Sequence, residues 1–247
     1  MIIMWFVGVD EAGRGPTLGP LVVAAFAIPE SDLKMLEEMG VKDSKLLSSA
    51  KRKALFSWIK SRSEARGWQF IIHHSSPAAI DLAMQLSNLN YHEVDLFAHI
   101  LNKIDLADEG GQLQLDACDT NAIRFGQNVA AKLHDWPKKG WAIDSRHGAD
   151  AFFLATAAAS ILAKESRDLA IEELKEKLGI DIGSGYPSDP KTKAALPLLL
   201  QEKTPHECLR WRWATVKKAW EKLGKGETPI RANSVEKGPV PAQRTLF

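Results

Sequence analysis

The sequence predicts an α/β fold, and three observations support that prediction. Short apolar, β-rich runs alternate along most of the chain with longer stretches of helical periodicity. The first two apolar runs are separated by a turn rich in Gly and Pro, which is typical of paired strands. With 247 residues, 45% of them hydrophobic, the chain can bury one sizeable core. We therefore expect one large domain followed by an appendage.

The individual elements follow in order from these patterns. Apolar runs predict strands over residues 2–9, 21–28, 68–73 and 112–116. Helical periodicity predicts helices over residues 49–66, 91–104, 121–133 and 154–178, and a last, basic helix over residues 205–225. Beyond residue 226 the composition becomes polar and contains Pro, so residues 227–247 are expected to form a flexible tail.

Composition narrows the class of protein. No apolar run approaches the ~20 residues that a membrane span needs. The first nine residues lack a basic region and a small-residue cleavage site, so we interpret them as a strand and not as a signal peptide. The two cysteines, Cys118 and Cys208, give no disulfide framework and suit a reducing compartment. We expect a cytoplasmic monomer.

The net charge of +1 hides an asymmetry along the chain. Residues 1–200 hold 22 Lys and Arg against 26 Asp and Glu, whereas residues 201–247 hold 10 against 5. A basic end suits a phosphate-backbone partner, and an acidic body is compatible with a carboxylate metal site. A solvated basic helix would explain the C-terminal charge almost as well.

The strongest chemical signal is the acidic pair Asp10 and Glu11 at the end of the first predicted strand. Such a pair is costly to bury unless a cation meets it. Because adjacent strand residues face opposite sides, the two could share one site only if the pleat breaks, and Gly13 and Gly15 would allow that. An exposed turn with an internal salt bridge stays open as an alternative. A phosphate-binding glycine loop is weaker, because no Gly-Lys-Ser/Thr follows.

This stretch and five later ones resemble the type 2 ribonucleases H, that is, ribonuclease HII, and in particular its archaeal branch. The segments occur in the family's order: GVDEAGRGP at 8–16, VKDSKL at 41–46, LDACD at 115–119, AAASILAK at 157–164, GSGYPSDP at 183–190 and RWRWATVKK at 210–218. The likeness runs from about residue 8 to residue 220. It implies a ribonuclease H-like mixed sheet flanked by helices over residues 1–200, with a basic helix over 201–226 packed on it.

The resemblance implies four carboxylates, Asp10, Glu11, Asp116 and Asp150, around Mg²⁺ or Mn²⁺. The chemistry agrees, because both ions prefer oxygen ligands and two of them can activate water for in-line displacement at a phosphate. Taken alone, Asp116 would be a turn residue after a strand and Asp150 a helix cap. Gly148 stands where the family usually has lysine, and Glu165 replaces a common apolar residue.

Substrate recognition is also implied by the resemblance. Backbone groups of Gly13, Arg14 and Gly15 would approach the ribose 2′-hydroxyl, the group that separates RNA from DNA at one nucleotide. Tyr186 would lie against the sugar of the adjoining deoxynucleotide, although alone it could be a surface aromatic. The remaining candidates are phosphate contacts, for which ordinary surface residues are an equal interpretation: Lys45, Lys164 and the helix bearing Arg210, Arg212, Lys217, Lys218 and Lys222. Trp211, Trp213 and Trp220 are interpreted as packing residues.

We therefore predict a metal-dependent endoribonuclease. It would cut RNA–DNA hybrids, and duplex DNA at single embedded ribonucleotides, leaving 5′-phosphate and 3′-hydroxyl ends. Gln243, Leu246 and Phe247 at the end of the tail resemble the start of a peptide that docks on the DNA sliding clamp. The rival hypotheses are a DNA nuclease or recombinase of the same fold, and a non-catalytic nucleic-acid-binding protein.

Overall fold

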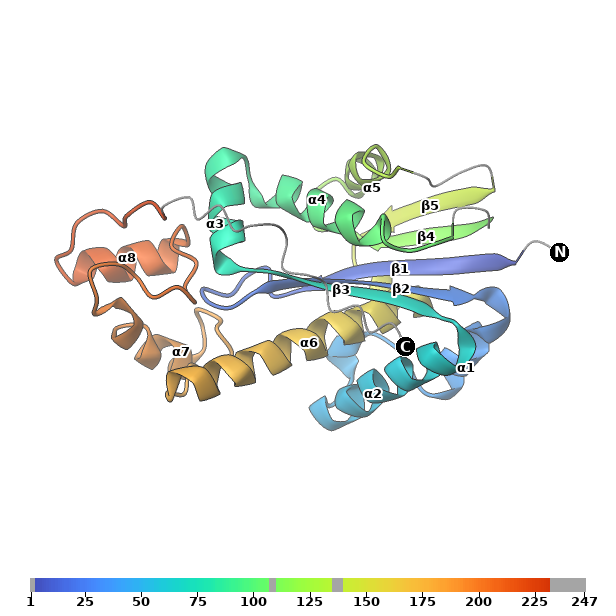
Figure 1. The fold of residues 1–247 in the computed structure, drawn as a ribbon, viewed down its shortest axis with the longest axis horizontal. Helices are drawn as coiled ribbons and strands as arrows, with labels where there is room; N and C mark the ends of the chain where they lie inside the picture. Colours follow the sequence, from blue (N-terminus) through green and yellow to red (C-terminus); the bar gives the residue numbers. More distant parts are fainter. Residues whose placement is uncertain (1–2, 107–109, 135–139, 232–247) are drawn as a thin grey trace.

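The centre of the protein is a five-stranded mixed sheet in the order β3-β2-β1-β4-β5 (Figure 1). The structure is a computed structural model that describes residues 3–106, 110–134 and 140–231. The strands are β1 (Met4–Ala12), β2 (Leu21–Pro29), β3 (Gln69–Ser75), β4 (Gly110–Asp116) and β5 (Trp141–Arg146). β1, β2 and β3 pair antiparallel, whereas β4 is parallel to both β1 and β5. The predicted α/β class is confirmed.

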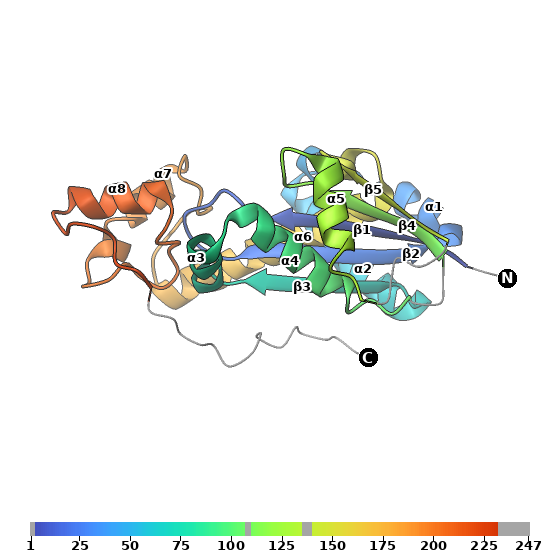
Figure 2. The same cartoon turned by 90° about the horizontal axis from the view of Figure 1, so that it is seen from above.

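Helices cover both faces of this sheet. They are α1 (Leu33–Glu38), α2 (Ser49–Arg66), α3 (Pro77–Leu86), α4 (Leu89–Leu101), α5 (Ala122–Ala130), α6 (Leu154–Leu178), α7 (Pro190–Ala195) and α8 (Ala214–Lys222), with 3₁₀ turns η1 (Glu30–Asp32), η2 (Ser44–Leu46), η3 (Ala149–Ala151) and η4 (Leu198–Leu200). One core cluster joins α3, α4 and α5 to the sheet, and a second joins α1, α2 and α6 to its other face (Figures 1 and 2).

The long helix α6 packs with its backbone directly on β1. A Cβ atom on Gly8 would lie 2.1 Å from the backbone nitrogen of Thr156, so only glycine fits at this crossing. Residues 155–159 of α6 are four alanines and one threonine. All five are buried, and their small side chains allow the same close approach. This contact places the start of α6 beside the end of β1, where the acidic pair lies.

Most predicted elements are confirmed, and two helices have the predicted bounds, 49–66 and 154–178. The sequence patterns missed α1, α3, α7 and β5. Strand β5 is an edge strand of six residues with no buried position, so its sequence carries no apolar alternation to detect.

The predicted helix over 205–225 is wrong in its first half. Only Ala214–Lys222 is helical, because the preceding segment pairs with the loop after β1. Leu209 forms a β-bridge with Leu18, and the amide of Arg210 donates to the carbonyl of Thr17 at 2.8 Å. Arg210 is 0% exposed, so its prediction as a phosphate contact is also wrong. Burial of the tryptophans at positions 211 and 220 agrees with their interpretation as packing residues.

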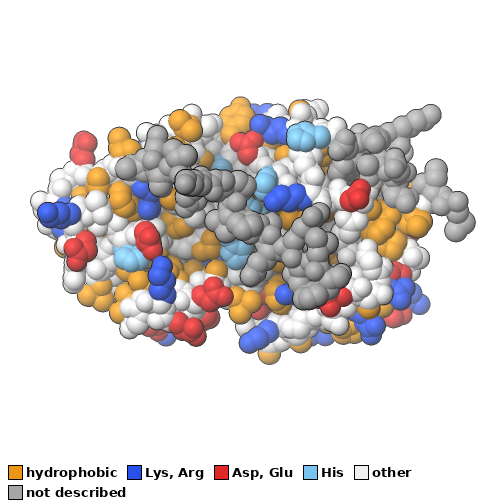
Figure 3. Space-filling view, in the orientation of Figure 1, with side chains coloured by type: hydrophobic (Ala, Val, Ile, Leu, Met, Phe, Trp, Pro, Cys, Tyr) orange, Lys and Arg blue, Asp and Glu red, His pale blue; other side chains and the backbone are white. Residues whose placement is uncertain are grey.

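The C-terminal helices α7 and α8 lie beyond one end of the sheet, away from the N-terminus (Figure 1). Around them, in the view of Figure 3, acidic and basic side chains are interspersed. Among the described helices, none combines the length and apolarity needed to cross a membrane. The predicted tail lies outside the described residues from position 232 onward.

Candidate metal centre

Three carboxylates from distant parts of the chain converge at the carboxyl ends of β1 and β4. Asp10, Asp116 and Asp150 each offer an oxygen atom, and these atoms lie within 4.8 Å of one another. Asp10 and Asp116 come from neighbouring parallel strands, whose carboxyl ends meet at the same sheet edge. Asp150 comes from η3, just before α6. The structure thus brings together three of the four predicted ligands.

Backbone hydrogen bonds fix the turn that carries Asp150. Oδ1 of Asp116 accepts from the amides of Gly148 at 2.7 Å and Ala149 at 3.2 Å. Gly148 has a φ of +65°, a left-handed conformation that a lysine at this position would adopt only with strain. The replacement of the family's usual lysine by glycine therefore fits this tight turn, and it leaves Asp150 facing Asp116.

The three-aspartate group is short of positive charge. Burial raises the pKa of Asp10 well above its ordinary value, and the negative charges of Glu11 and Asp116 raise it further. Burial also raises the pKa of Asp150, against the opposing effect of Lys45, whose Nζ lies 4.0 Å from Oδ2 of Asp150. Oδ1 of Asp150 is buried with no hydrogen-bond partner among the described residues. These hard oxygen donors, one of them unpartnered, fit a divalent cation such as Mg²⁺ or Mn²⁺.

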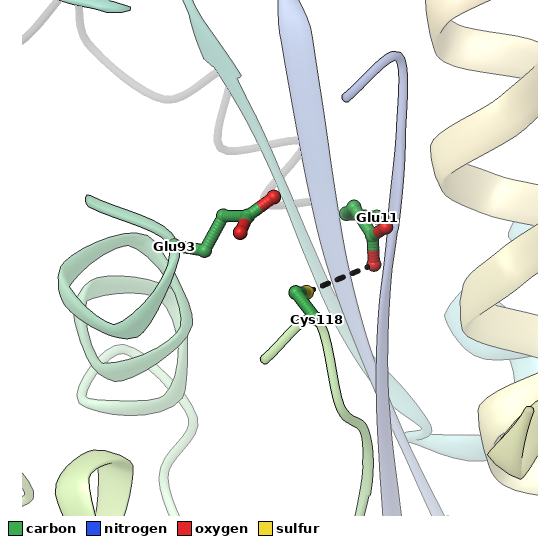
Figure 4. Close-up of side chains that lie close together, drawn as sticks. All are labelled: Glu11, Glu93 and Cys118. Carbon is green, nitrogen blue, oxygen red and sulfur yellow. Dashed lines mark hydrogen bonds between the residues drawn. The ribbon is translucent and has the colours of Figure 1, made fainter. Parts of the chain in front are cut away.

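Along β1, Glu11 alternates with Asp10 and follows the side that holds Val7 and Val9, but its carboxylate reaches back to that of Asp10. The pleat does not break, because the pairing with β2 continues regularly through Ala12. The carboxylate of Glu11 lies near Glu93 of α4 and near Cys118, whose Sγ donates to Oε2 of Glu11 at 3.3 Å (Figure 4). Burial raises the pKa of Glu11 and the charge of Asp116 raises it further, whereas interactions with the Cys118 thiol and the Asp10 carboxyl oppose the rise, so Glu11 lies beside the three-aspartate group.

Glu93 is a buried acid that the sequence reasoning did not single out. Nε of Arg14 donates to Oε1 of Glu93 at 2.9 Å, and Nη2 of Arg14 donates to Oδ1 of Asn90 at 2.7 Å. Burial and, to a smaller extent, the charge of Glu11 raise the pKa of Glu93 to about 8 against the opposing effect of Arg14. The available signal was an acidic residue at a buried position of the predicted helix over 91–104.

The glycine loop after β1 and the loop bearing Tyr186 lie against each other. A Cβ atom on Gly15 would lie 3.6 Å from Cε1 of Tyr186, an ordinary contact distance. Gly13 has a φ of +91°, and a Cβ atom there would lie 2.4 Å from Nε of Arg167. Arg167, which the sequence reasoning also missed, lies with Cζ 5.4 Å from the centroid of the Tyr186 ring. The two predicted substrate-binding loops therefore form one surface, with Arg167 beneath it.

The two candidate lysines differ in their surroundings. Lys45 is 74% exposed at its side chain, next to Asp150, and its turn is tied to α6 by the Ser44–Ser160 hydroxyl pair at 2.9 Å. Lys164 forms an ion pair with Asp168 at 3.6 Å. Of the two, Lys45 is therefore the lysine beside the three-aspartate group. Further along α6, the unexpected Glu165 forms a buried ion pair with Arg52.

Comparisons with known proteins agree with this geometry. Residues 7–216 match the family model described as Ribonuclease HII. The chain is 44% identical to "Ribonuclease HII" of Thermococcus sibiricus over 219 residues, which cover 88% of this chain and 92% of the relative. A crystal structure of ribonuclease H2 from Pyrococcus horikoshii matches with a TM-score of 0.78 and 35% identity, covering 90% of this chain and 100% of that one. A PCNA:RNase HII complex from Archaeoglobus fulgidus matches with a TM-score of 0.71 and 34% identity, covering 85% and 95%.

Proposed function

The chain belongs to the ribonuclease HII family, and we propose that Asp10, Asp116 and Asp150 hold the divalent cation of its reaction. It is a metal-dependent endoribonuclease with the ribonuclease H-like fold, and it cleaves RNA in RNA–DNA hybrids. The observation that carries the proposed site is the convergence of three buried carboxylates, one with an unpartnered oxygen. Three ionised carboxylates can be held this close only if positive charge compensates them.

We assign the cation as Mg²⁺ or Mn²⁺, because every candidate ligand atom in the three-aspartate group is a carboxylate oxygen. When bound, such an ion supplies the charge that activates the attacking water and stabilises the departing oxygen. Glu11, whose carboxylate lies beside that of Asp10, adds negative charge and is the fourth carboxylate of the site. Lys45, exposed beside Asp150, binds the phosphate next to the scissile bond. The products carry 5′-phosphate and 3′-hydroxyl ends.

In this proposal, the loop of Gly13, Arg14 and Gly15 selects RNA, because its backbone approaches the ribose 2′-hydroxyl. Tyr186 lies against this loop and is 41% exposed, so its ring can meet the neighbouring deoxyribose. That arrangement suits a junction between one ribonucleotide and DNA. Lys164, farther along α6, contacts the phosphate backbone of the duplex. Residues 1–200 form the catalytic domain in this proposal, and 201–226 form the appendage.

The test is a labelled DNA duplex that carries one ribonucleotide, incubated with Mg²⁺, with Mn²⁺ or with chelator. Cleavage should need the metal and should stop in Asp10→Asn. Asp119→Asn is the matched control, because Asp119 is also acidic and follows β4 but forms an ion pair with Arg124. Equal cleavage rates for Asp10→Asn and wild type would refute the proposed metal site. Cleavage of an all-DNA duplex at the same rate would instead favour the DNA nuclease hypothesis.

We also propose that Gln243, Leu246 and Phe247 bind the DNA sliding clamp. These residues lie outside the described part of the chain, so the support is the tail sequence and the relative solved in complex with PCNA. Gln243→Ala and Phe247→Ala should weaken binding of the full chain to the clamp, whereas Arg244→Ala should not. Equal binding by all three variants would refute this partner site.

Both cysteines are free, which supports a reducing, cytoplasmic location.

A further inference from the structure

Arg210 is a completely buried arginine that the proposed chemistry leaves unexplained. Its guanidinium donates three hydrogen bonds to main-chain carbonyls of the loop after β1. Nη2 donates to Gly13 at 2.6 Å, Nη1 to Arg14 at 2.9 Å and Nε to Gly19 at 3.1 Å. Two of these acceptors belong to the segment that, in the proposed function, reads the 2′-hydroxyl.

Trp213 completes the same set of contacts. Its indole Nε1 donates to the carbonyl of Gly15 at 3.2 Å, and its ring centroid lies 4.9 Å from Cζ of Arg210. Two side chains that lie about two hundred residues farther along the chain therefore take all three consecutive carbonyls of Gly13, Arg14 and Gly15. We call Arg210 and Trp213 the carbonyl clamp.

The carbonyl clamp determines where the amides of the loop point. In a trans peptide, the N–H of one residue points opposite to the carbonyl of the residue before it. The amides of Arg14 and Gly15 therefore point away from the clamp, and neither donates to another described residue. Residue 16 is proline and has no amide to donate. Two consecutive donors are thus left without a partner among the described residues, in a loop that Tyr186 contacts at Gly15.

Keeping a guanidinium here is costly, which argues that its position matters. Burial and, to a smaller extent, the nearby charge of Arg167 lower the pKa of Arg210 to about 9. Carbonyl oxygens compensate a buried charge only in part. The planar fork of arginine can hold several carbonyls at fixed angles, which a single ammonium cannot do.

We propose that Arg210 and Trp213 are positioning residues that set selectivity for the 2′-hydroxyl. They hold the loop so that the Arg14 and Gly15 amides meet the ribose while the metal centre holds the phosphate. The C-terminal segment thereby takes part in choosing the cleaved nucleotide. This inference rests on the proposed function, in which the same loop senses the ribose.

The test compares kcat/KM on two DNA duplexes that differ at one position. One duplex carries a ribonucleotide there, and the other carries its 2′-fluoro analogue. The fluorine cannot donate a hydrogen bond and is a weak acceptor. Trp213→Phe removes the indole donor and keeps an aromatic ring. It should lower kcat on the ribonucleotide duplex about tenfold, leave KM nearly unchanged and reduce the rate ratio between the two duplexes about fivefold. Arg210→Lys keeps the charge, loses the fork and should reduce the ratio further.

Trp220→Phe is the matched control. Its Nε1 is buried and has no hydrogen-bond partner among the described residues, so the variant removes an indole donor with no role in the clamp. The rate ratio should stay at the wild-type value. Thermal unfolding of all three variants separates misfolding from misplacement, and Trp213→Phe suffices if Arg210→Lys does not fold.

The outcomes distinguish this inference from the proposed function. If wild type requires metal and prefers the ribonucleotide, but Trp213→Phe keeps the same ratio, the clamp does not set selectivity and the proposed function stands. A proportional loss on both duplexes would also overturn the inference, because it indicates a general loss of activity. If wild type itself does not distinguish ribose from deoxyribose, the proposed function fails first.

Discussion

The end of β1 contributes to two acidic groups, and the two groups differ in the positively charged side chain that lies beside them. On the α6 face, Asp10 meets Asp116 and Asp150, and Nζ of the exposed Lys45 lies 4.0 Å from Oδ2 of Asp150. On the α4 face, Glu11 accepts a hydrogen bond from a thiol, and Glu93 pairs with Arg14 (Figure 4). The first group has an exposed lysine 4.0 Å from one of its acids, whereas in the second group an arginine is hydrogen-bonded to one of the acids. Acidic clusters therefore indicate a cation site only where the chain itself does not supply the cation.

The largest expected effect compares the two adjacent acids directly. Asp10→Asn should lower the metal-dependent cleavage rate more than about 100-fold, because it removes a ligand from the undercompensated group. Glu11→Gln should lower it about tenfold, because Glu11 lies outside the three-aspartate group and acts through charge. Single-turnover rates on a single-ribonucleotide duplex measure both. A larger loss in Glu11→Gln than in Asp10→Asn would reverse the assignment of the two faces.

Stability should depend on pH in opposite directions with and without metal. A carboxyl whose pKa is higher in the folded chain stabilises folding at low pH, and that contribution is lost as pH rises through the folded pKa. Burial raises the pKa values of Asp10 and Asp150 above the ordinary 3.8, so metal-free protein should become less stable as pH rises from that value through their folded pKa values. Metal binding needs deprotonated ligands and should strengthen over the same range.

The measurement for that prediction is thermal unfolding in chelator and in excess Mg²⁺ or Mn²⁺. An ion at about 100 times its Kd stabilises by about 2.7 kcal/mol, which raises Tm by about 5–10 °C for a chain of this size. Asp10→Asn should abolish this increase and should itself be more stable than wild type in chelator. Parallel pH profiles in the two conditions would contradict the metal assignment.

The sequence predicted the candidate residues better than their arrangement. Asp10 and Asp116 were found in short segments of a fixed order and Asp150 only through the family pattern, and the structure brings the three together. The position of Glu11 was inferred from a pleat that would break at Gly13 and Gly15, but the strand pairs regularly through Ala12. A short motif identifies residues, whereas the face that each one occupies depends on pairing with β2, which local sequence does not encode.

The C-terminal segment shows a second limit of sequence reasoning. Arg210 and Arg212 lie two residues apart in a basic stretch, and charge alone gives no reason to separate them. The structure buries Arg210 completely because its segment pairs with residues 17–19. Contacts across nearly two hundred residues determine that burial. In contrast, helix bounds at 49–66 and 154–178 were predicted correctly because caps and periodicity are local.

A smaller effect is expected at the ion pair on the α4 face. The pKa of Glu93 is raised to about 8, so between its ordinary value of 4.5 and about 8 the metal-free fold loses stability as pH rises. Glu93→Gln removes that dependence and keeps an oxygen that can accept from Arg14. We expect the variant to be more stable than wild type at pH 8 by roughly 1–3 kcal/mol. Chelator-containing denaturant titrations at two pH values measure it, and a loss of stability at pH 8 would indicate that the Arg14–Glu93 pair is net stabilising.

The smallest expected effect is at Cys118, and it decides whether the α4 face binds metal at all. Burial raises the pKa of this thiol well above its ordinary value, and the charge of Glu11 adds to the rise, so the sulfur stays protonated and donates to Glu11. A metal ligand would instead be a thiolate. Titration with Co²⁺ should therefore activate the enzyme without a sulfur-to-cobalt charge-transfer band, and Cys118→Ser should change the cleavage rate less than about threefold, because serine keeps a donor. A thiolate band that disappears in Cys118→Ser would place a cation on this face and would end the contrast between the two acidic groups, since both would then need a metal to balance their charge.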